Sequence, residues 1–134
     1  DREIILNKAA EEILGTLITQ YQPEKVFLFG SLVTGDVQEW SDLDFAIIKD
    51  TSLSFLERSE QVALLCMAPV GVDYLVYTPA EWAEMVANQN PFIVEEVLGK
   101  GKLLYERESR AIFPKARARP CATPYPTPSA ATPL

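Results

Sequence analysis

Hydrophobic and polar positions along the chain form two patterns, a helical spacing of apolar residues and short continuous apolar runs. Residues 3–21 place apolar side chains at every third or fourth position, which predicts an amphipathic helix ending before Pro23. Short apolar runs at 25–30, 42–49 and 72–77 have the length of buried strands. The first part of the chain therefore alternates between helical and extended segments.

Two helices separate or follow these strands. Residues 54–68 show helical spacing of apolar positions and end before a proline and a glycine. Residues 78–89 open with Thr78 and carry Glu81 three positions later, the pattern of a capping box at a helix N-terminus. The remaining pattern predicts a helix over 91–98 and a short final strand at 102–106.

The order of these elements predicts the sheet topology. A strand, a helix and a further strand form a crossover, so runs 42–49 and 72–77 are expected to be parallel neighbours. The end of run 25–30 reaches the edge where those two strands begin only if it is antiparallel to 42–49. We therefore expect an α/β (α+β) fold with a small mixed sheet in the order 1-2-3 and flanking helices.

Composition divides the chain into a domain and a tail. The chain has 134 residues, 48% of them hydrophobic and 23% charged, which suits one globular domain spanning residues 1–106. Residues 107–134 hold six of the ten prolines and few large apolar side chains, so they cannot bury enough surface to fold alone. We predict a Pro-rich disordered tail; an arm that docks a partner and a segment foreign to the natural protein are the alternatives.

Scarce residue types exclude several classes of site. The sequence has no histidine, which excludes Ser-His-Asp and Cys-His catalysis as well as histidine metal ligands. Cys66 and Cys121 lie far apart and are expected to be reduced thiols of a cytoplasmic protein. No apolar run approaches the roughly 18 residues of a membrane span and no signal-peptide pattern is found, so no membrane association is expected.

Charge limits the kind of partner. The net charge is −7, but residues 1–105 hold 7 Lys and Arg against 17 Asp and Glu, whereas residues 106–134 hold 5 against 2. An acidic body is poorly suited to gripping a phosphate backbone, so direct nucleic-acid binding is not expected. The substrate should be a small molecule or a protein, and self-association stays open.

Three aspartates are the candidate chemical groups. Asp42 and Asp44 are two positions apart in the second apolar run and share one face of it, and Asp73 lies near the start of the third. Parallel pairing would bring all three to one edge of the sheet, where their like charges repel unless a cation lies between them. Mg²⁺ prefers one or two such carboxylates together with substrate phosphates. The aspartates are therefore candidate magnesium ligands.

A candidate phosphate-binding turn faces them. Gly30 ends the first apolar run and lets a backbone approach a ligand closely, while Ser31 can add a hydroxyl donor or cap a short helix. No GxxxxGK[ST] sequence occurs, which excludes a P-loop. A phosphate cradle opposite a carboxylate cluster indicates metal-assisted phosphoryl or nucleotidyl transfer.

Other users of paired carboxylates fit the sequence less well. Nucleotide-sugar glycosyltransferases that use an Asp-x-Asp metal site normally need a much longer chain. A two-carboxylate glycosidase would require neither the Gly-Ser turn nor the third aspartate. A protein that masks a basic partner with its acidic surface, without catalysis, is the remaining alternative.

Gly30-Ser31 followed by Asp42-Leu43-Asp44, in the pattern G-S-x10-D-x-D, resembles the signature of the nucleotidyltransferase superfamily that includes DNA polymerase beta. The short length and the stretch from "VDYLVYTPAEW" to "GKGKLLYE" resemble its minimal nucleotidyltransferase (MNT) branch. The resemblance covers residues 1–106. Many relatives read G-S-x-A-R-G, whereas this chain has Thr34 in place of the arginine.

The resemblance implies a site and an activity. Gly30 and Ser31 would hold the nucleoside triphosphate, Asp42 and Asp44 would bind two Mg²⁺ ions, and Asp73 would bind one of them and help activate the acceptor hydroxyl. The branch is commonly encoded beside a HEPN-domain toxin, so the expected activity is transfer of AMP from ATP to a hydroxyl of that protein as its antitoxin. A weak or inactive antitoxin that only binds its partner is the alternative, because the missing arginine would lower triphosphate affinity or turnover.

Overall fold

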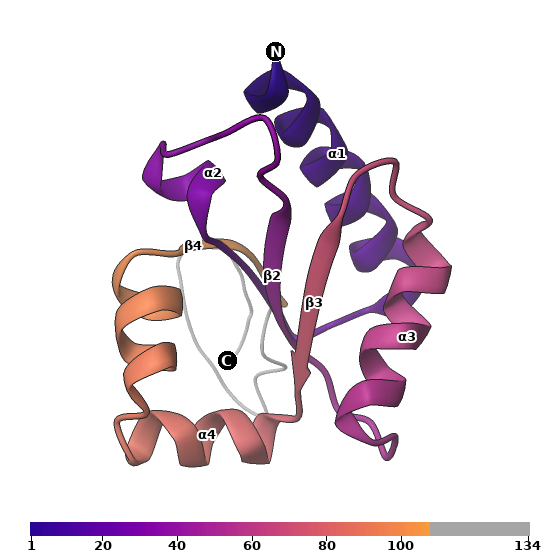
Figure 1. The fold of residues 1–134 in the computed structure, drawn as a ribbon. Helices are drawn as coiled ribbons and strands as arrows, with labels where there is room; N and C mark the ends of the chain where they lie inside the picture. The colour runs from indigo at the N-terminus through magenta and orange to yellow at the C-terminus, as the bar shows by residue number, and fades with distance from the viewer. Residues whose placement is uncertain (108–134) are drawn as a thin grey trace, which may run out of the picture.

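Four strands form one mixed sheet in the computed structural model, which describes residues 1–107 (Figure 1). The sheet has the order β3-β2-β1-β4. Its strands are β1 (Lys25–Phe29), β2 (Leu43–Ile48), β3 (Val72–Tyr77) and β4 (Lys102–Glu106). β1 is antiparallel to β2 and to β4, whereas β2 and β3 are parallel. The predicted order 1-2-3 is confirmed, and β4 extends the sheet on the free side of β1.

Helices cover both faces of this sheet. On one face lie α1 (Arg2–Thr16), its continuation η1 (Leu17–Tyr21) and α3 (Phe55–Cys66), with α1 and α3 together on the right of Figure 1. On the other face lie α4 (Pro79–Ala87) and η2 (Phe92–Gly99), at the foot and lower left of the same view. The short helix α2 (Ser31–Thr34) stands at the end of β1.

Alternation along the strands divides the core into two clusters. In β1, Val26 and Leu28 pack toward α1 and α3, and Phe27 and Phe29 pack toward α4 and η2. In β2, Leu43, Phe45 and Ile47 are fully buried in the first cluster, which leaves the opposite face of this strand for Asp44. The carboxylate therefore lies on the α4 and η2 side of the sheet.

Local capping explains where two of the helices begin. Thr78 Oγ1 accepts a hydrogen bond from the Glu81 backbone N–H while the Glu81 carboxylate accepts one from the Thr78 N–H, so the predicted capping box is confirmed. Ser54 and Glu57 form a second capping box at the start of α3. The helix predicted over 3–21 is present, but its last five residues widen into the π-helical turn η1.

Among residues 1–107, no helix is long and apolar enough to cross a membrane. The tail predicted over 107–134 falls, from residue 108 onward, outside the described residues, and its disorder stays a prediction.

Candidate functional site

The candidate site lies where β1 ends and β2 and β3 begin, at the upper end of the sheet in Figure 1. In the antiparallel pair, Phe29 of β1 lies opposite Asp44 of β2. In the parallel pair, Asp44 lies beside Asp73 of β3. The sheet thus brings Gly30, Asp44 and Asp73 to one edge although they are widely separated in sequence.

Gly30 has a conformation and an environment that only glycine tolerates. Its φ is 86° and its ψ −158°, and a Cβ atom built on it would overlap the Asp44 carboxylate at Oδ2. Its carbonyl accepts hydrogen bonds from the N–H groups of Val33 and Thr34, both at 3.1 Å, so Gly30 is the N-cap of α2. The turn therefore holds its backbone directly against one of the three aspartates.

Ser31 begins α2 beside this carboxylate. Within residues 1–107 its hydroxyl makes no hydrogen bond, and the capping role that the sequence left open belongs instead to Gly30. The helix ends at Gly35, which has φ 88° and whose N–H donates to the Ser31 carbonyl at 2.9 Å. The Ser31 hydroxyl is therefore available to a ligand.

Asp44 and Asp73 form the electrostatic centre of the site. Burial first, and then the neighbouring Asp73 carboxylate and the charge of Asp42, together raise the pKa of Asp44 to about 6. Asp73, on the edge strand, is exposed. Because like charges oppose each other here, a cation placed between the two carboxylates would be attracted by both.

Asp42 lies beside this pair but in a different setting from the predicted one. β2 begins at Leu43, so Asp42 precedes the strand that was predicted to contain it. Its Oδ1 lies 3.7 Å from Arg2 Nη2, and its carboxyl group covers Gly71, where a Cβ atom would come within 2.6 Å of Oδ1. Arg2 also donates from Nε to the Ser41 carbonyl at 3.0 Å. Asp42 is thus engaged by the start of α1.

The three aspartates are the oxygen donors that the site offers to a magnesium ion. Within the part of the chain that the structure describes, no three His, Cys, Asp or Glu side chains are arranged as a preformed metal cage. Mg²⁺ usually takes only one or two carboxylates and completes its shell with substrate phosphates and water. The paired oxygens of Asp44 and Asp73, next to an open Gly-Ser turn, fit that requirement, so the predicted ligand role of the aspartates stays a prediction compatible with this geometry.

Positive charge is absent from the segment that builds most of the site. No lysine or arginine occurs between Val26 and Ile48. Thr34, at the position of the missing arginine, is exposed, and its hydroxyl lies 3.4 Å from the Ser31 carbonyl. The role of Arg2 was not predicted from the sequence, because its contact with Asp42 joins residues 40 positions apart and no local motif indicates it.

Comparison with known proteins identifies the fold. A crystal structure of a putative nucleotidyltransferase from Sulfolobus solfataricus is 23% identical, covers 78% of this chain and 84% of its own, and superposes with a TM-score of 0.54. A crystal structure of a toxin-antitoxin with AMP-PNP is 19% identical, with 73% of each chain covered and a TM-score of 0.44, a likeness too low to bear on function. No curated protein sequence matches the chain.

A family model gives the assignment. The model described as "Polymerase beta, Nucleotidyltransferase" matches residues 11–110, which include Gly30, Ser31 and all three aspartates. This match extends over well beyond half of the chain, and the strand arrangement around the aspartates agrees with the resemblance noted in the sequence. The chain therefore belongs to the polymerase beta nucleotidyltransferase family.

Proposed function

We propose that this nucleotidyltransferase moves a nucleoside monophosphate, AMP from ATP, to a hydroxyl group of a partner protein, with pyrophosphate leaving. The observation that carries the proposal is the pairing of Asp44 with Asp73 directly beside the Gly30 turn. This arrangement supports a site in which carboxylates and a phosphate cradle face one another.

In the proposed reaction the acceptor oxygen attacks the α-phosphorus of ATP, and the bond from that phosphorus to the pyrophosphate oxygen breaks. Gly30 and Ser31 hold the triphosphate, the turn by close backbone approach and the serine by its free hydroxyl. Asp73 accepts the proton of the acceptor hydroxyl, since no histidine exists in the chain. Asp42, Asp44 and Asp73 would hold two Mg²⁺ ions, which when bound supply positive charge to the phosphates.

We further propose membership of the MNT branch, with a HEPN-domain toxin as the partner and an antitoxin role in the cytoplasm. The stretch from "VDYLVYTPAEW" to "GKGKLLYE" supports the branch, and the acidic body of residues 1–105 supports a basic protein partner. An antitoxin that stays bound to its target tolerates the slow turnover expected from Thr34 in place of arginine.

A non-catalytic antitoxin is the second candidate. It is favoured by two observations: the site segment lacks a lysine or arginine, and Arg2 engages Asp42. In this case the acidic surface neutralises the partner by binding alone.

Nucleotide binding is the first test. Replacing both Asp42 and Asp44 by Asn should weaken Mg²⁺-dependent ATP binding in calorimetry by about tenfold or more, because charge-assisted contacts to the ion are lost. The double variant should still fold, because removing two of the three neighbouring negative charges lowers their mutual repulsion and offsets the contacts that are lost. Equal ATP affinity of parent and double variant would contradict the proposed site.

The decisive test uses the protein encoded beside this one, together with ATP and Mg²⁺. Intact-mass spectrometry of that protein should show a gain of one or more AMP units that disappears with Asp42→Asn. If the parent chain and the Asp42→Asn variant both neutralise the toxin and its mass does not change, the masking function is favoured instead.

A further inference from the structure

Nearly all cationic side chains of the described residues already have partners. Lys49 donates to the Tyr21 carbonyl at 2.8 Å. Within residues 1–107 this leaves only Lys8 and Lys102 with neither an ion pair nor a side-chain hydrogen bond. The other cations form the ion pairs Arg2–Asp42, Lys25–Glu106, Arg58–Glu81, Lys100–Glu96 and Arg107–Glu24.

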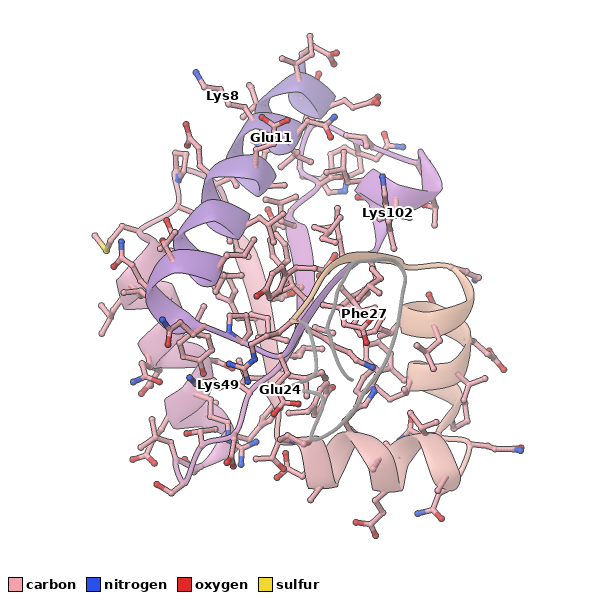
Figure 2. All side chains as sticks on the ribbon, turned by 180° about the vertical axis from the view of Figure 1, so that it is seen from behind. Lys8, Glu11, Glu24, Phe27, Lys49 and Lys102 are labelled. Atoms are coloured by element: carbon pink, nitrogen blue, oxygen red, sulfur yellow. The ribbon has the colours of Figure 1, made fainter. Side chains whose placement is uncertain are left out.

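These two free lysines differ in position. Lys102 is the first residue of β4 and pairs with Leu28 of β1, two residues before Gly30. Its side chain therefore leaves the sheet on the face of Leu28, where α1 and α2 pack, and not on the face of Asp44. The chain is closely packed where this strand starts, because a Cβ atom on Gly101 would lie 3.1 Å from the Leu28 carbonyl and closer still to the Val97 carbonyl. Figure 2 shows the Lys102 side chain extending from β4 toward α2, whereas Lys8 lies on α1.

The site needs positive charge that its own segment does not contain. A nucleoside triphosphate carries several negative charges and would approach an edge that already holds three carboxylates. No lysine or arginine lies between Val26 and Ile48, and Arg2 is engaged by Asp42. Lys102 is therefore the free cation of the described residues whose strand pairs with β1 next to the Gly30 turn and whose side chain extends toward α2 (Figure 2).

We propose that Lys102 binds the terminal phosphates of a nucleoside triphosphate held at Gly30 and Ser31. The inference rests on the proposed function and names a further substrate-binding residue for it. A lysine suits this place because its ammonium group is a compact charge with three donors on a flexible stem. Its side chain is exposed and has no partner among residues 1–107, so no interaction within the described part of the chain has to break before it reaches the phosphates.

The test compares matched lysine variants in calorimetric titrations with a non-hydrolysable ATP analogue and Mg²⁺. Lys102→Gln should weaken binding about tenfold, as expected for loss of one charge-assisted contact. Lys8→Gln removes the same charge from a side chain that is also exposed, and it should change the affinity less than about twofold, because a distant surface charge is screened by salt. Lys102→Arg should restore most of the affinity.

The length of the phosphate chain supplies a second readout. Because Lys102 is assigned to the terminal phosphates, Lys102→Gln should leave the affinity for AMP unchanged while lowering that for the triphosphate. Unchanged triphosphate affinity in Lys102→Gln, with binding still lost in the Asp42→Asn, Asp44→Asn double variant, overturns the Lys102 assignment and leaves the proposed function intact. Absence of triphosphate binding by the parent protein overturns both. Thermal melting of each variant verifies that it is folded.

Discussion

At the scale of single residues, the pairing of Asp44 with Asp73 opposes ionisation of Asp44. Binding of a proton or of a cation relieves the repulsion between the two carboxylates. The pKa of Asp44 is raised to about 6 from an ordinary 3.8, first by burial and then by the Asp73 carboxylate. A carboxyl group with a raised pKa in the folded state favours folding while it is protonated. Its contribution is therefore lost as the pH rises from about 4 through about 6.

Asp44→Asn should accordingly stabilise the metal-free protein at pH 8 and have little effect at pH 4. The asparagine resembles the protonated acid and lacks the charge that opposes folding above pH 6. Melting temperatures measured in a chelating buffer across this range check the prediction. Asp50→Asn, at an exposed position away from the carboxylate pair, is the control and should show no such pH dependence. A variant less stable than the parent at pH 8 would contradict the account.

Gly30→Ala should damage both the fold and the site. The substitution forces a side chain into a positive-φ conformation and against Asp44 Oδ2, at a cost of about 1–3 kcal/mol. Chemical denaturation measures the loss, and ATP titration should show weaker binding. Gly15→Ala is the matched control: nothing lies within 4 Å of its added Cβ, and a helical alanine should stabilise α1 by about 0.5–1 kcal/mol. Equal effects of both substitutions would refute the special role of Gly30.

At the scale of elements, one buried arginine ties α3, β3 and α4 together. The Arg58 side chain is 8% exposed and pairs with Glu81 at 2.7 Å. It also donates to the carbonyls of Val76, at 3.0 Å, and Leu53, at 2.8 Å. Hydrogen bonding to Arg58 lowers the pKa of Glu81, which also closes the capping box of α4. A single side chain thereby fixes the ends of three elements opposite the candidate site.

Arg58→Ala should lower the free energy of unfolding by about 3 kcal/mol, since it leaves buried carbonyl groups without donors. Because the pKa of Glu81 is lowered in the folded state, the stability from this pair is present above the ordinary value of 4.5 and lost as the pH falls below it. The difference between parent and variant should therefore shrink in acid. Urea unfolding at pH 7 and pH 3.5 measures both effects.

Lys100→Ala is the control for this prediction. The Lys100–Glu96 pair is exposed and spans one helical turn, so its loss should cost about 0.5 kcal/mol or less. Losses of similar size in the two variants would show that burial of Arg58 is not what makes its ion pair stabilising.

At the scale of the whole molecule, residues 1–107 contain a four-stranded sheet with a hydrophobic cluster on each face. The buried members of both clusters lie between Leu6 and Val97, and Leu104 and Tyr105 of β4 pack against the first cluster. A chain ending at Arg107 should therefore keep its melting temperature within about 2 °C, well under 1 kcal/mol for a domain of this size. A chain ending at Gly101, which lacks β4, should melt clearly lower. Destabilisation by the first truncation would contradict the predicted domain boundary.

Much of this architecture follows from the sequence alone, because it depends on local periodicity and short motifs. Helical spacing of apolar positions located most helices, short apolar runs located the strands, and the Thr78 capping box identified the start of α4. The crossover rule predicts Asp73 at the same edge of the sheet as Asp42 and Asp44, and the structure pairs it with Asp44. The G-S-x10-D-x-D spacing indicated the family that the comparison then assigned.

What only the tertiary structure decided are contacts between residues far apart in the chain. The ion pair of Arg2 with Asp42 and the position of Lys102 beside β1 depend on how α1 and β4 dock on the sheet. The raised pKa of Asp44 depends on burial on the α4 and η2 side. The period of the apolar positions tells which face of a helix or strand a side chain takes. The partner that it meets there is set by the packing of one element on another, and this packing arranges the charges around the candidate site.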